Sequence, residues 1–190
     1  MEAATVTDDR LYREYLAGDT CAGDTLMLRY ADPLTAYLDA FLHNAQDAED
    51  LMLDCFTVIL VDKPKIREGH FRAYLFKTAR NMANRLWRVR FSRQEFSLDE
   101  TLGETLPAKE DTPEEAIRKK DRNAILMRCL DRIAPQYREA LWLVYGLDLS
   151  YADAAAVLGG NVKRVENLLS NGKKSLRKEL EKEGITYADI

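Results

Sequence analysis

The cations between residues 63 and 93 are the first residues of this chain whose types and spacing indicate a chemistry. Ten Lys and Arg residues stand there against one acidic residue, Glu68, which gives the segment a net charge of +9. Polar residues recur within it at the three- and four-residue intervals of one helix face: Lys77, Arg80, Asn81, Asn84, Arg85 and Arg88. Lys and Arg neutralise phosphates, and Arg and Asn hydrogen-bond base edges. Because solvated helices ordinarily mix both signs of charge, this face favours a nucleic-acid partner.

A second basic group precedes the helix expected over residues 71–90. Lys63, Lys65 and Arg67 lie beside Pro64, and Gly69 ends the group. Proline and glycine this close together predict a loop rather than a helix. A basic loop at this place is suited to hold a phosphate or a flipped base.

Aromatic residues on the same expected helix allow two interpretations. Trp87, with Tyr74 and Phe91 near it, offers flat surfaces on which unstacked bases can stack. Aromatic side chains on helices belong more often to the core, however, and packing is the more frequent of the two roles.

The segment from residue 149 to 180 is typical of a helix-turn-helix. Ser150 and Asp153 have the spacing of a capping box, Gly159 and Gly160 supply a turn, and Asn161 can cap a second helix. The inward stripe predicted for that helix is Val162, Val165, Leu169, Gly172 and Leu176. The outward set is polar and basic: Asn161, Lys163, Arg164, Asn167, Ser170 and Lys174. This layout places a recognition helix in the major groove of DNA, although helix pairs of this length also occur as plain packing units.

An acidic helix is predicted over residues 47–60. We expect Asp47 to cap it and Asp50 to lie in its first turn, where the helix dipole favours a carboxylate. An apolar stripe follows at helical spacing: Ala48, Leu51, Met52, Cys55, Phe56 and Ile59. Leu53 lies among carboxylates on the opposite face. It is either an ordinary exposed leucine or part of a docking patch for a basic, amphipathic partner, and the spacing leaves both open.

The elements that position these residues are all helical. Apolar residues recur at helical spacing over residues 7–92 and again over 116–184, and no segment alternates as a strand does. Residues 93–115 between them are acidic and contain Gly103, Pro107 and Pro113, which predicts a flexible linker. The expected architecture is all-α, with two small helical domains joined by this linker.

The total charge of −4, from 28 basic and 32 acidic residues, hides this segregation of charge. No apolar run is long enough to span a membrane, and no secretory signal is expected at the start, so the chain is expected to be cytoplasmic. Three scattered cysteines and two histidines give no disulfide frame and no metal site. The sequence contains no nucleophile–base pair and no glycine-rich phosphate loop, which argues against an enzyme.

Several segments, in order, carry a family likeness. They are AGD at 17–19, LMLRYADPLTAYL at 26–38, DAEDLMLDCF at 47–56, FRAYLFKTARNMANRLWRVR at 71–90 and IAPQYREALWLVYGLDLSYADAAAVLGG at 133–160. Over about residues 10–180 the chain resembles an extracytoplasmic-function (group IV) sigma factor of bacterial RNA polymerase. The resemblance implies a region-two domain, an acidic linker and a region-four helix-turn-helix domain.

The resemblance also implies partners and site residues. The region-two helix at 47–56 would dock on core RNA polymerase, with these candidates: Asp47, Glu49, Asp50, Leu53, Asp54 and Thr57. Recognition and melting of the −10 element would fall to Lys63, Lys65, Arg67, Lys77, Arg80, Asn81, Asn84, Arg85, Trp87 and Arg88. The outward residues of the second helix of region four, Asn161 to Lys174, would recognise the −35 element. An anti-sigma factor is a further partner that the family implies; cofactors and catalytic residues are not.

The sequence departs from the family pattern at four positions. Arg85 stands where an acidic or amide residue is usual, Glu166 where a basic residue is common, and Leu168 and Asn171 where arginine is common. Two alternatives stay open: a helix-turn-helix regulator whose N-terminal half is an effector or dimerisation domain, and a polymerase-binding protein that does not recognise promoters. The second is prompted by Glu166 and Arg85.

Overall fold

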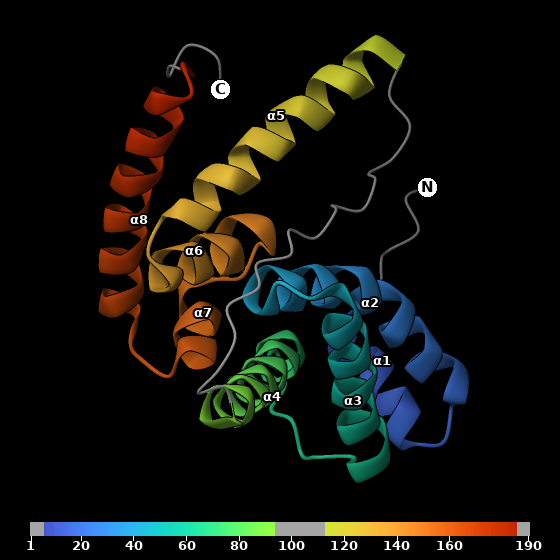
Figure 1. Cartoon of the computed structure of the whole chain (residues 1–190). Coiled ribbons are helices and arrows are strands. Elements are labelled where there is room, and N and C mark those ends of the chain that lie inside the picture. The colour runs from blue at the N-terminus through green and yellow to red at the C-terminus, as the bar shows by residue number, and fades with distance from the viewer. Residues whose placement is uncertain (1–5, 94–112, 186–190) are drawn as a thin grey trace. The chain divides into compact units, whose positions relative to one another are not determined.

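The computed structural model describes residues 6–93 and 113–185, and every regular element within them is a helix. Figure 1 follows these helices along the chain. Their bounds are α1 (Asp8–Leu16), α2 (Thr20–Leu42), α3 (Ala45–Asp62), α4 (Phe71–Arg93), α5 (Pro113–Arg132), α6 (Pro135–Leu141), the π-helix η1 (Trp142–Gly146), α7 (Tyr151–Leu158) and α8 (Val162–Lys182). The all-α class predicted from the sequence is confirmed.

The chain divides into two compact units, one with α1 to α4 and the other with α5, α6, η1 and α8. Helices extend into both ends of the linker expected at 93–115, because α4 includes Arg93 and α5 begins at Pro113. The other residues of that linker, with Gly103 and Pro107, lie outside the described part. In the two described ranges, no helix combines the length and the apolar character needed to cross a membrane.

Helix α3 begins earlier than the sequence predicted. His43 ends α2 in a left-handed conformation with φ 53°, and the Asn44 side chain accepts a hydrogen bond of 3.0 Å from the Asp47 backbone N–H. Asn44 is therefore the cap, and the prediction that Asp47 caps this helix is wrong. Asp47 lies instead in the first turn, where its carboxylate faces the positive end of the helix dipole.

The core of the first unit lies among α2, α3 and α4. Helix α2 contacts α1, α3 and α4, and α3 also contacts α4. The predicted stripe of α3 is buried at Ala48, Leu51, Cys55, Phe56 and Ile59. Each large apolar side chain buried in this way contributes about 1.5–3 kcal/mol. This packing fixes which faces of α3 and α4 remain exposed.

In the second unit α6 and α8 approach closely at Gly172. A Cβ atom at Gly172 would lie 3.2 Å from the Leu141 Cδ1 and 3.3 Å from the Tyr137 Cβ. Glycine allows this distance because it has no side chain. The close approach helps to hold α8 in place, so that its opposite face is left for other contacts.

Helix α6 does not end at Leu141 but continues directly into one π-helical turn, η1. The Leu147 backbone N–H donates to the Trp142 carbonyl oxygen at 2.9 Å, across five residues. The helical segment therefore ends only after Gly146.

The helix-turn-helix layout predicted around residue 150 is present. The Ser150 hydroxyl accepts from the Asp153 backbone N–H at 3.1 Å and donates to the Asp153 carboxylate at 2.6 Å. Gly159 is left-handed, with φ 67°, and the Gly160 N–H donates to the Ala155 carbonyl oxygen at 2.9 Å. The capping box thus starts α7, and Gly159 and Gly160 end it. The next residue, Asn161, caps α8.

One detail of α8 differs from the sequence analysis. Val162, predicted to face inward, is 41% exposed, whereas Leu168, which was not placed on the stripe, is buried. The buried positions Val165, Leu168, Leu169 and Gly172 follow the spacing i, i+3, i+4, i+7. The packed face is therefore turned slightly from the predicted one, and the first turn, which carries Val162, extends beyond it.

Candidate nucleic-acid interfaces

Helix α4 presents a polar face of one sign opposite its buried side. Lys77, Asn81, Arg85 and Arg88 are exposed. Arg80 and Asn84 are half-buried, so they lie at the edge of this face rather than at its centre. The helix contains no Asp or Glu. The structure thus brings the six predicted residues onto one side of one helix, where cations and amides can contact phosphates and base edges together.

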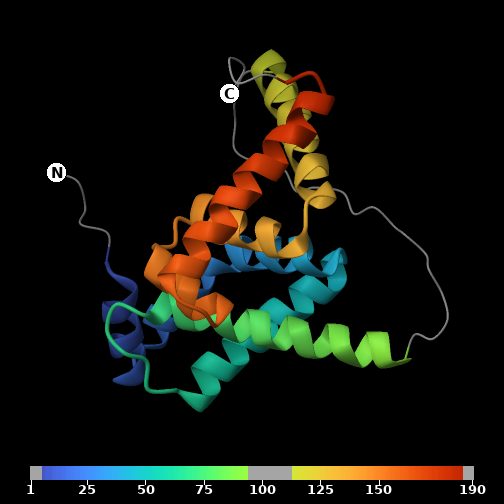
Figure 2. The same cartoon turned by 90° about the vertical axis from the view of Figure 1, so that its left-hand side faces the viewer.

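The basic loop connects α3 to the start of α4, as the ribbon in Figure 2 shows. Lys63 ends α3 in a left-handed conformation with φ 45°, and Gly69 is left-handed with φ 80°. Lys65 and Arg67 are exposed between them. The two left-handed residues turn the chain at the start and end of the loop, which leaves three exposed cations near the start of α4.

Trp87 lies exposed on α4, with 52% of its surface accessible. The more frequent role for such an aromatic, packing in the core, is therefore wrong for Trp87. Tyr74 is half-buried, and the side chain of Phe91 lies outside the described part. An exposed indole beside a basic face is a suitable surface for an unstacked base.

The outward face of α8 is polar, as its spacing predicted. Lys163, Arg164, Asn167, Ser170 and Lys174 are exposed, and so is Asn161 at the start of the helix. The Asn161 side-chain oxygen accepts a hydrogen bond of 2.9 Å from the Arg164 backbone N–H, which confirms Asn161 as the cap. Its side-chain oxygen is thus engaged by its own helix, and its NH₂ group is the part suited to contact DNA.

The face of α3 opposite the core carries an exposed leucine among carboxylates. Leu53 is 48% exposed, and Glu49, Asp50 and Asp54 beside it are exposed as well. Thr57, also exposed, donates its hydroxyl to the Leu53 carbonyl oxygen at 2.9 Å. This acidic patch, which we define as Glu49, Asp50, Leu53, Asp54 and Thr57, offers apolar contact and negative charge to a basic partner. Asp47, the sixth predicted docking residue, is half-buried at the start of the helix.

Comparison with known proteins identifies the family. Residues 26–91 match the profile of Sigma-70 region 2, and residues 123–176 match that of Sigma-70, region 4. The ECF RNA polymerase sigma factor SigE of Mycolicibacterium smegmatis is 27% identical over 163 residues, which cover 84% of this chain and 62% of SigE. The ECF RNA polymerase sigma factor BldN of Streptomyces coelicolor is 30% identical over 156 residues, which cover 80% of this chain and 58% of BldN. The chain belongs to the ECF sigma factors.

The fold agrees with this family. The sigma factor RpoE of Bartonella quintana, solved in complex with the anti-sigma factor NepR, superposes with a TM-score of 0.68 at 21% identity, covering 83% of this chain and 96% of RpoE. The chain spans only about three-fifths of the length of these relatives, 62% of SigE and 58% of BldN.

The matched regions of this ECF sigma factor contain all the predicted site residues. The acidic patch, the basic loop and α4 up to Arg88 fall within region 2, and the outward face of α8 up to Lys174 falls within region 4. Their individual roles stay predictions. The buried position of Leu168 gives the departure from arginine there a physical reason, because a side chain in the core cannot contact DNA.

One element of this ECF sigma factor lies outside the region 2 match and was given no role by the sequence analysis. Helix α1, residues 8–16, precedes the matched segment 26–91. In the structure its side chains bond to Leu60 near the end of α3 and to Pro64 and Gly69 of the basic loop, which lie 45, 52 and 60 residues away along the chain. No local pattern in the sequence indicates such a contact.

Across residues 6–93 and 113–185, no group of three or more His, Cys, Asp and Glu side chains is arranged to hold a metal ion. The residues of these interfaces are cations, amides, carboxylates and exposed apolar groups.

Proposed function

We propose that this chain is a transcription initiation factor that binds core RNA polymerase and directs it to specific promoters. The observation that carries the proposal is the exposed face of α4, which has cations and amides but no carboxylate and lies inside the Sigma-70 region 2 match. In this proposal α4 and the basic loop recognise the −10 element, and the outward face of α8 recognises the −35 element.

The acidic patch on α3 is the proposed docking surface for polymerase. Leu53 supplies an apolar contact, and Asp50 and Asp54 flank it with negative charge. Interfaces combine a desolvated apolar centre with a polar rim, and charges of opposite sign accelerate and orient the encounter. A basic, amphipathic surface on the polymerase is the partner that this patch fits.

Promoter melting follows from the same arrangement. Unstacking a base step costs a few kcal/mol, and stacking an extruded base on an aromatic side chain returns about 1–3 kcal/mol. The exposed Trp87 and the exposed cations of the basic loop are the groups proposed to capture the separated strand. RNA synthesis itself belongs to the polymerase, so no catalytic residue and no cofactor enters the proposal.

An anti-sigma factor is a further proposed partner. The RpoE protein that shares this fold was solved in complex with the anti-sigma factor NepR. A protein that covers the acidic patch or the basic faces would keep this cytoplasmic factor from polymerase and DNA until it is released.

The test is transcription in vitro with purified core polymerase and a pool of genomic promoter fragments. We expect a stable complex with core polymerase and transcripts that begin at a defined subset of promoters. A complex without defined starts would indicate a polymerase-binding protein that does not recognise promoters. Promoter binding without a complex would indicate a helix-turn-helix regulator.

Reversal of charge on the acidic patch tests the docking surface in the same assay. The double variant Asp50→Lys, Asp54→Lys is expected to lose at least about tenfold in affinity for core polymerase, because both charges then oppose a basic partner. Asp62 is an exposed carboxylate at the end of the same helix. Asp62→Lys is therefore the control and should change the affinity for core polymerase little. Equal effects of the two changes would remove the patch from the interface.

A further inference from the structure

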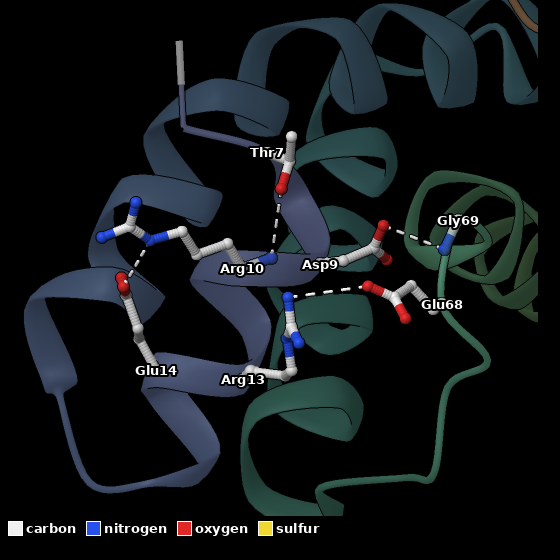
Figure 3. A network of polar contacts seen from close by, with 7 residues as sticks. All are labelled: Thr7, Asp9, Arg10, Arg13, Glu14, Glu68 and Gly69. Carbon is white, nitrogen blue, oxygen red and sulfur yellow. Dashed lines mark hydrogen bonds and ion pairs between the residues drawn. The ribbon is translucent and has the colours of Figure 1, made fainter. Parts of the chain in front are cut away.

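Helix α1 is bound to the segment that runs from the end of α3 to the start of α4. The Asp9 carboxylate accepts a hydrogen bond of 2.9 Å from the Gly69 backbone N–H (Figure 3). The Tyr12 hydroxyl donates to the Pro64 carbonyl oxygen at 2.7 Å, and the Tyr15 hydroxyl donates to the Leu60 carbonyl oxygen at 2.6 Å. Three side chains of one helix thus hold backbone groups just before, within and at the end of the basic loop.

These bonds act on a backbone that is otherwise unfavourable. Lys63, a non-glycine residue, is left-handed with φ 45°, a conformation that costs free energy and persists only where its surroundings hold it. Lys63, Lys65 and Arg67 also repel one another. The Lys63 ammonium lies 5.0 Å from the centre of the Tyr15 ring, close enough for a cation–π attraction. Helix α1 therefore stabilises the loop at its most strained residue.

The two kinds of contact differ in strength. Burial raises the pKa of Tyr12 to about 12, and its hydroxyl donates to the Pro64 carbonyl oxygen in a part-buried bond of 2.7 Å. By contrast, the ion pair between Arg13 and Glu68 is 3.6 Å long and exposed on both sides (Figure 3), and such pairs contribute little. Asp9, Tyr12 and Tyr15 are thus the contacts that matter, and Arg13 serves as an internal control.

We propose that Asp9, Tyr12 and Tyr15 are positioning residues for promoter recognition: they hold the basic loop in the one conformation that presents Lys65 and Arg67 to the −10 strand. The inference rests on the proposed function, and it assigns a role to α1, which lies outside the Sigma-70 region 2 match. Helix α1 itself needs no contact with DNA.

Asp9 gives the sharpest test, because substitution by alanine or by asparagine separates the effect of its charge from that of its hydrogen bond. Asp9→Ala removes the acceptor for the Gly69 N–H, whereas Asp9→Asn retains a side-chain oxygen that can accept it. Arg13→Ala removes the exposed ion pair on the same helix. Each full-length variant is combined with core polymerase, and bound sequences are selected from forked promoter DNA whose −10 segment is randomised.

For Asp9→Ala we expect the preference for the selected −10 sequence to fall about fivefold, the effect of losing one hydrogen bond. Hydrogen exchange of the Gly69 amide should accelerate in the same variant. Asp9→Asn should keep most of the preference, and Arg13→Ala should change it less than about twofold. Affinity for core polymerase should not change in any of them.

The outcomes separate this inference from the proposed function. If wild-type holoenzyme enriches no sequence, the proposed function fails and this inference fails with it. If wild type enriches a sequence and Asp9→Ala gives the same profile, only the role of α1 is overturned. A lower melting temperature of Asp9→Ala with an unchanged profile would show that Asp9 stabilises the fold and does not position the loop, which also overturns it.

Discussion

Lys163 and Glu166 form an ion pair on the outward face of α8, with the Lys163 Nζ 3.1 Å from a carboxylate oxygen of Glu166. Glu166 occupies a position where the family commonly has a basic residue. The side chains are 77% and 44% exposed, so the pair contributes at most about 1 kcal/mol and exchanges readily with water. The carboxylate nevertheless neutralises a cation of the proposed −35 surface and is placed to repel phosphate.

Glu166→Gln should therefore strengthen binding to duplex DNA that carries a −35 element. The change frees Lys163 and removes a negative charge, so the plot of log affinity against log salt should steepen by about 0.9, the value for one phosphate contact. The measurement is fluorescence anisotropy of labelled promoter with holoenzyme between 50 and 200 mM salt, roughly the range in which such contacts dominate.

Glu181→Gln is the matched control for this prediction. Glu181 is exposed on the same helix, 15 residues from Glu166 and thus roughly 22 Å along the axis. The two variants have the same net charge. If both steepen the salt dependence equally, the effect is one of total charge and the Lys163 pair has no part in it.

Leu53→Ala should weaken binding to core polymerase about tenfold. A leucine buried in an interface contributes about 1.5–3 kcal/mol, and alanine retains only a small part of it. The folded chain itself should keep its melting temperature, because Leu53 is 48% exposed and outside the core. Affinity is measured by titrating the labelled chain with core polymerase.

Val61→Ala is the control, since Val61 is 71% exposed on the same helix and lies two turns beyond Leu53. We expect it to change affinity less than twofold, roughly the scatter for surface substitutions. An equal loss in both variants would mean that the docking surface is not confined to the acidic patch.

Much of the fold was predictable because its pattern is local. The stripe of α3 that includes Leu51 and Phe56 is buried as its spacing predicted, and the turn at Gly159 ends α7. The start of α3 was not predictable in the same way. Asn44 and Asp47 are both good capping residues, and the apolar period, which begins at Ala48, does not distinguish between them.

The candidate sites were predictable only in part. Spacing placed the cations of α4 on one face, but it could not show that Trp87 is exposed, because exposure depends on which other helices cover that end of α4. The contact of Asp9 with Gly69 joins residues 60 positions apart. Such a contact follows from the packing of α1 and leaves no periodic trace in the sequence.

Alkylation should distinguish the three cysteines of the folded chain. Burial raises the pKa of Cys55 to about 12, with a smaller contribution from Asp54. The thiolate, which is the reactive form, is then only about one part in ten thousand at pH 8. Burial also raises the pKa of Cys129, whereas Cys21 is exposed.

With iodoacetamide at pH 8 we expect mass spectrometry to find label on Cys21 before either buried thiol. Because a raised pKa keeps the thiol protonated until the pH approaches it, Cys55 should stay unlabelled up to about pH 10 while the chain is folded. All three should react in denaturant, which is the control for reagent access. Rapid labelling of Cys55 in the folded chain would contradict its buried position.

Trp87 allows a test of strand capture. If an unpaired base stacks on its indole, Trp87→Ala should lower the fraction of open promoter about tenfold, because base–aromatic stacking is worth about 1–3 kcal/mol. Trp87→Phe keeps a flat surface and should retain most of the opening. The fraction of open promoter is measured by the permanganate reactivity of unpaired thymines in the holoenzyme complex. Tyr145→Ala is the control, because Tyr145 is a similarly exposed aromatic residue in the second unit. If Trp87→Phe loses as much as Trp87→Ala, stacking is not what the indole contributes; if neither loses opening, the captured base lies elsewhere on α4 or in the basic loop.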